Sequence, residues 1–93
     1  MSTDRDLAGP WRIAPSVALR PESFGALAYD FSTRRLTFVK DVRLVEVLHA
    51  LEASIDVDAA LDRCGIDDQA RPSFQRALVD LAERGTIERR QVA

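Results

Sequence analysis

Hydrophobic and polar residues alternate with two different periods along the chain, and the period changes near residue 41. Before that point, the stretches Ala26 to Phe31 and Arg35 to Val39 alternate with a period of two, as β-strands do. Residues 32–34 form a connection of hairpin length between them. The pattern predicts an antiparallel hairpin in which each strand has one strongly apolar face, carrying Leu27, Tyr29 and Phe31 on the first strand and Leu36 and Phe38 on the second.

A further strand is expected before this hairpin. Pro15 interrupts the stretch from Trp11 to Arg20, and Pro21 closes it. We therefore expect only a short strand around Ser16 to Leu19. It should lie at a sheet edge, because proline cannot donate a backbone hydrogen bond.

After Asp41, a candidate helix N-cap, apolar residues recur with helical spacing in three segments. Helices are expected over Val42 to Ala53, from Val57 to Cys64, and over Pro72 to Arg84. A glycine follows the second and the third segment, where it can take the left-handed conformation that ends a helix. After the third helix, Thr86 and Ile87 resume an extended character.

This order of elements predicts the α+β class: a small three-stranded antiparallel sheet packed on a three-helix bundle, similar to winged helix-turn-helix modules. The chain has 93 residues, which is enough for one hydrophobic core. We expect a single domain over residues 11–88, with flexible tails at residues 1–10 and 89–93.

Composition narrows the classes of partner and compartment. A formal net charge of −2 and a pI near 5.3 give no net positive field, so nucleic acid is not the expected partner. A single cysteine excludes an internal disulfide and a thiolate-rich metal site. The first residues contain no apolar signal region, and no apolar run approaches the length of a membrane span. We expect a cytoplasmic protein that does not bind membranes.

Charge is distributed unevenly along the chain. Residues 34–43 carry four basic residues and one acid, a local charge of +3, whereas residues 52–68 carry six acids and one arginine, a local charge of −5. The basic cluster lies on and beside the strand Arg35 to Val39, which is predicted to have a free edge. The cluster could protect that edge from aggregation. It could also favour an acidic peptide that adds to the edge as an extra strand, and the two roles are compatible.

Candidate catalytic residues are few. His49 lies on the flank of the first helix, and Cys64 completes the apolar stripe of the second, where a thiol behaves as a small hydrophobe. The sequence contains no metal-ligand cluster, phosphate-binding loop or nucleophile elbow. We therefore expect no cofactor and no enzymatic activity.

Two alternatives remain open. In a winged-helix DNA-binding regulator the helix Pro72 to Arg84 would be the recognition helix, but its two arginines are offset by two acids. The acidic helical segment could instead hold an enzyme without contact with any peptide.

Several segments resemble the mycofactocin-system (MftB-like) peptide chaperones, small relatives of PqqD. They are VALRPE at 17–22, FGA at 24–26, FSTRRLTF at 31–38, CGI at 64–66 and FQRALVDLAERGTIE at 74–88. The resemblance extends from Trp11 to about Glu88. The first three segments are quite specific, whereas the helical half alone is generic.

The resemblance implies a RiPP recognition element, which binds the leader of a ribosomally synthesised precursor peptide. In that family the leader adds as a strand beside the third strand, and the chaperone presents the peptide to a radical SAM maturase that modifies its C-terminal Val-Tyr. Any iron–sulfur chemistry would belong to that enzyme. A free sheet edge also leaves room for a homodimer. Carried onto this chain, the implied peptide-binding residues are Arg34, Arg35, Leu36, Thr37, Phe38, Val39 and Lys40 at the strand edge, and Phe74, Ala77, Leu78 and Leu81 on the third helix.

Overall fold

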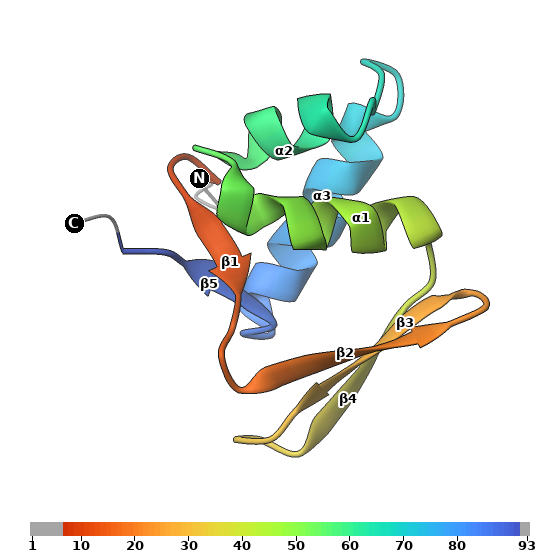
Figure 1. The fold of residues 1–93 in the computed structure, drawn as a ribbon, viewed down its shortest axis with the longest axis vertical. Coiled ribbons are helices and arrows are strands. Elements are labelled where there is room, and N and C mark those ends of the chain that lie inside the picture. The colour runs from red at the N-terminus through yellow and green to blue at the C-terminus, as the bar shows by residue number, and fades with distance from the viewer. Residues whose placement is uncertain (1–6, 92–93) are drawn as a thin grey trace.

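The computed structural model describes residues 7–91 and has the expected α+β composition (Figure 1). The strands and helices in chain order are β1 Trp11–Ile13, β2 Val17–Glu22, β3 Gly25–Asp30, β4 Arg35–Val39, α1 Val42–Ala50, α2 Val57–Arg63, α3 Arg71–Glu83 and β5 Ile87–Arg89. A short 3₁₀ turn, Leu51–Ala53, extends α1. No helix in this part of the chain is long and apolar enough to cross a membrane.

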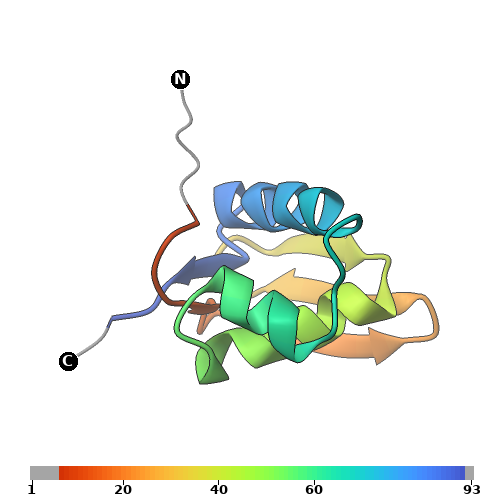
Figure 2. The same ribbon diagram turned by 90° about the horizontal axis from the view of Figure 1, so that it is seen from above.

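The strands form two antiparallel sheets. One has three strands in the order β2-β3-β4, so the hairpin predicted from the alternating pattern is present with Asp30 opposite Arg35. The other pairs β1 with β5 and joins the two ends of the described chain. The helices lie on one side of the three-stranded sheet, and α3 runs alongside β4 (Figures 1 and 2).

The first part of the chain differs from the prediction. The stretch from Trp11 to Arg20 contributes two strands, because Pro15 lies in the turn between β1 and β2. The second strand continues through Pro21, which was predicted to close it, and ends at Glu22. β2 is an edge strand as expected, and its outer side tolerates a residue without an N–H.

The predicted apolar face of the hairpin is not the face that meets the helices. Small side chains, those of Ala26, Ala28 and Val39, are buried on the helix side of the sheet. Their small size lets α1 approach the sheet closely. The large apolar residues of the two strands therefore point to the other side, where Phe38 is 55% exposed.

The three helices begin and end close to the predicted residues. The side chain of Asp41 accepts a hydrogen bond from the N–H of Arg43, and that of Asp56 accepts one from Ala59, so both aspartates are N-caps. Gly65 ends α2 with a φ of +69°, and the N–H of the next residue, Ile66, reaches back to a carbonyl of the helix.

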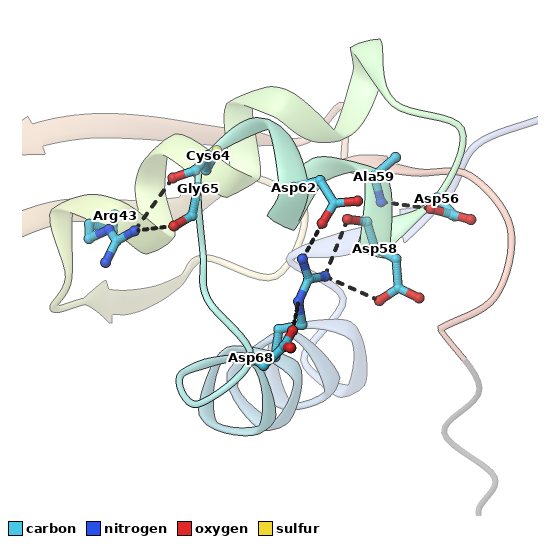
Figure 3. A network of polar contacts seen from close by, with 9 residues as sticks. Arg43, Asp56, Asp58, Ala59, Asp62, Cys64, Gly65 and Asp68 are labelled. Atoms are coloured by element: carbon cyan, nitrogen blue, oxygen red, sulfur yellow. Dashed lines mark hydrogen bonds and ion pairs between the residues drawn. The ribbon is translucent and has the colours of Figure 1, made fainter.

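One arginine pairs with half of the acids in the acidic segment, residues 52–68. The guanidinium of Arg71, on α3, forms ion pairs with Asp58, Asp62 and Asp68 (Figure 3). Its side chain is 20% exposed, less than any of its three partners. The acidic charge therefore ties α2 to the start of α3, and much of it is compensated within the fold.

The described parts of the predicted tails take part in the structure. The indole N–H of Trp11 donates to the carbonyl of Leu7, and Leu7 packs against the core. At the other end, Arg89 is in β5 opposite Trp11, and its guanidinium lies 4.9 Å from the centre of the indole ring. Residues 1–6, 92 and 93, the outer parts of the predicted tails, lie outside the described residues.

Candidate functional site

The outer edge of β4 offers main-chain groups to a partner. In the described chain β4 pairs only with β3. The N–H of Phe31 donates to the carbonyl of Ser16, so the main-chain groups of Phe31 point to the β2 side. The main-chain groups of successive residues in a strand point to alternate sides, so those of Ala28, three residues earlier, point to β4. Thr37 is opposite Ala28 and therefore faces β3. The intervening residues, Leu36 and Phe38, consequently point their N–H and C=O groups away from the sheet.

A groove runs between this edge and α3. Its first cavity has a volume of about 240 Å³ and is lined by Leu36 to Lys40 on one wall and by Leu44 and part of α3 on the other. A second cavity, of about 270 Å³, continues past Lys40 to Phe74. Both cavities share Lys40, Leu44 and Ala77. Together they form a trough that follows the strand, as an added strand requires.

The wall on α3 is built from residues with helical spacing. Ala77, Asp80, Leu81 and Arg84 line the first cavity, and their spacing of i, i+3, i+4 and i+7 places them on one helix face. Phe74, one turn before Ala77 and buried, lines the second.

The structure brings together most of the predicted site residues, but not all. Leu78 is completely buried and packs in the core, so its side chain does not face the groove. Arg34 and Arg35 are exposed at the hairpin end of β4 and do not line either cavity. Five lining residues were missed, namely Leu44, Asp80 and Arg84 in the first cavity and, in the second, Asp41 and Ser73.

The groove combines an apolar floor with charged ends. Leu44 and Leu81 are buried beneath it. At its rim, the guanidinium Nε of Arg84 lies 3.0 Å from a carboxylate oxygen of Asp80, and both residues line the first cavity together with Leu81. The ammonium of Lys40 lies 5.8 Å from the centre of the Phe38 ring. Such a site can take apolar side chains inside and acidic groups at its edge.

The two candidate catalytic residues, His49 and Cys64, do not line either cavity of the groove. The described residues contain no group of three or more potential metal ligands. Burial raises the pKa of the Cys64 thiol, so its reactive thiolate form is disfavoured. His49 is exposed on the flank of α1, as predicted. What the site offers is main-chain pairing and side-chain pockets.

Comparison with known proteins gives a consistent set of relatives. The model of the family described as "Peptide chaperone MftB family" matches residues 10–88. Curated proteins named peptide chaperone MftB are similar to the chain in Mycobacterium tuberculosis, with 38% identity over 97% of the chain and 83% of the relative, and in Mycolicibacterium smegmatis, with 43% identity over 83% and 76%. In Mycobacterium ulcerans a protein of that name is 42% identical over 77% of the chain and 66% of the relative.

No solved structure matches the chain significantly. The family model covers the sheets, the helices and both walls of the groove. The chain thus belongs to the MftB peptide chaperone family.

Proposed function

We propose that the chain binds the leader of a ribosomally synthesised precursor peptide as an added strand on β4. In this proposal, the leader's main chain pairs with the outward groups of Leu36 and Phe38. Alternate leader side chains enter the groove against α3, where Ala77 and Leu81 receive them.

The observation that carries the proposal is the coincidence of the open edge with the groove. An open strand edge alone is common, and natural proteins usually protect it. Here the edge forms one wall of two adjoining cavities, and a helix with a small residue at Ala77 forms the other. A peptide in this position would pair its backbone and bury its side chains at the same time.

The role of the protein in this proposal is that of a non-catalytic chaperone. A leader peptide is flexible, and an ordered edge lowers the entropy cost of holding it in one conformation. The chaperone then presents the peptide to a radical SAM maturase in mycofactocin biosynthesis, in the cytoplasm, where the effective concentration of the peptide at the enzyme is raised. Membership of a peptide chaperone family supports this role. We further propose that the fold is PqqD-like and related to winged helices.

Basic residues near the edge would act mainly on encounter. Arg34 and Arg35 are exposed at one end of β4 and Lys40 at the other. Positive charge along the strand speeds the approach of an acidic leader and is screened by salt. The DNA-binding alternative has less support, because Arg71 and Arg84, at the two ends of α3, pair with aspartates, and the helix carries only one further basic residue, Arg76.

Titration of ¹⁵N-labelled protein with a synthetic leader peptide tests the proposal. We expect amide shifts at Leu36, Phe38 and the groove face of α3, and slower exchange of the two β4 amides in the complex. Shifts confined to residues 52–68 would contradict strand addition at β4. Duplex DNA serves as the control ligand, since a salt-sensitive complex with it would favour the regulator instead.

A further inference from the structure

The outer face of the three-stranded sheet carries an exposed apolar surface that shares only Leu36 and Phe38 with the groove. The face is turned away from the helices, and no other described element covers it (Figure 1). Phe31 is 64% exposed, Leu36 51% and Phe24 38%. We call this surface the aromatic face; its residues are Phe24, Leu27, Tyr29, Phe31, Leu36 and Phe38.

Contacts between aromatic rings restrain the side chains of the aromatic face. The rings of Phe24 and Phe38 are stacked with their centres 5.8 Å apart, and those of Tyr29 and Phe31 meet edge to face at 4.8 Å. Leu27 lies opposite Phe38, between the two aromatic pairs. Because the rings already hold one another, little side-chain freedom is left to lose when a partner docks. Contiguous apolar patches of several hundred Å² on soluble proteins usually mark interaction sites.

Charges at the border of the aromatic face indicate what kind of partner fits. Arg34 is in the hairpin turn at one end, and Lys40 follows β4 at the other, with its ammonium over the Phe38 ring. Arg20, on β2 opposite Leu27, forms an ion pair with Glu22 at 3.3 Å, so the unpaired basic charge of the border lies at its two ends. A second copy docked face to face would bring these basic borders together. A partner with an apolar centre and an acidic border avoids that repulsion.

Continuity with the peptide edge indicates which partner this is. Leu36 and Phe38 direct their side chains to the aromatic face and their main-chain groups to the open edge of β4. A leader strand paired to that edge would extend the sheet, and its alternate side chains would lie about 5 Å from those of Leu36 and Phe38. A protein that docks here therefore contacts chaperone and peptide together.

We propose that the aromatic face is the docking surface for the enzyme that modifies the bound peptide, which meets it with apolar residues bordered by carboxylates. This inference rests on the proposed function, since it assumes that the leader occupies β4. The enzyme binds the peptide-loaded chaperone more tightly than the empty one, and by linkage the enzyme tightens the hold on the leader.

The test compares two substitutions of exposed apolar residues. Phe31→Ser changes the aromatic face at a position outside the groove, and Ile55→Ser changes a residue that is 79% exposed in the connection before α2. The affinity of each variant for the radical SAM maturase, with and without precursor peptide, is measured by calorimetry. We expect F31S to weaken enzyme binding about tenfold or more, as loss of an aromatic anchor does, and I55S to leave it unchanged.

Separate readouts distinguish the two proposals. Leader binding by F31S should equal that of the wild type. This result would also show that the variant is folded. Phe24→Ser provides a second variant of the aromatic face. Enzyme binding by F31S and F24S at wild-type strength would overturn the docking proposal, as would a wild-type dimer that F31S converts to a monomer. Failure of the wild type to bind any leader would instead overturn the proposed function.

Discussion

Gly25, the first residue of β3, lies against the backbone at the end of β4: a Cβ built on it would approach the amide nitrogen of Asp41 to 2.9 Å and the carbonyl oxygen of Val39 more closely still. Its φ is +147°, a conformation that residues with a side chain rarely adopt. This contact fixes the end of β4 that leads into α1, and with it one end of the peptide edge.

Gly25→Ala should therefore destabilise the domain by about 2 to 3 kcal/mol, the sum of backbone strain and steric overlap. Urea unfolding followed by circular dichroism measures the loss. Gly85→Ala is the matched control: Gly85 also has a positive φ, but a Cβ there would contact nothing within 4 Å. The control should lose about 1 kcal/mol. Equal losses of stability in the two variants would show that the contact with Val39 does not contribute to the free energy of unfolding.

The two sides of β4 should respond differently to proline. Leu36→Pro removes an N–H that points to the open edge, so we expect the domain to stay folded and leader affinity to fall about tenfold, as for one lost main-chain hydrogen bond. Thr37→Pro removes an N–H that faces β3 and should cost about 1 to 3 kcal/mol of stability. Leu36→Ala keeps the N–H and controls for the lost side chain. Full leader binding by folded L36P would contradict strand addition.

Local signals in the sequence predicted much of this fold. The hairpin follows from alternation, and the helix limits follow from caps such as Asp56 and Gly65, whose effects act within a few residues. The β1–β5 pair was not predicted. Arg12 and Glu88, whose ion pair joins the two strands, are 76 positions apart, and each strand has three residues, too few to show a period.

Alternation also could not tell which face of the hairpin is buried. It correctly groups Leu27 with Tyr29, but the helices pack on Ala26 and Ala28 because small residues allow close approach. Two more residues of the α3 wall could have been predicted from the sequence, since Asp80 and Arg84 continue the helical spacing that begins at Ala77. Leu44 comes from another element, and only the tertiary structure brings it to the site.

Filling the groove at Ala77 should block the leader without disturbing the fold. Ala77 is partly exposed and lines both cavities, so a phenylalanine there would occupy the space into which leader side chains insert. We expect Ala77→Phe to lower leader affinity about tenfold or more, because an anchor pocket is lost. Gln75→Phe, two residues earlier and on another face of α3, is the control for added aromatic surface and should bind normally. Calorimetric titration with the leader compares the two, and normal binding by A77F would place the peptide elsewhere.

Acid should loosen the hairpin end of the peptide edge through Asp30. The hydroxyl of Ser32 donates to the Asp30 carboxylate at 2.7 Å and its N–H does so at 2.9 Å, and these hydrogen bonds hold the pKa of Asp30 below its ordinary value of 3.8. A lowered pKa stabilises the folded state at pH values above 3.8, and this contribution is lost as the pH falls through the lower value of the folded state.

Asp30→Asn cannot titrate, so the wild type should be more stable than D30N at neutral pH, and the difference should shrink below about pH 4. Urea unfolding from pH 7 to pH 3 measures it, with the exposed Glu52→Gln as control, and a difference that stayed constant over that range would mean that the carboxylate charge contributes nothing to the turn.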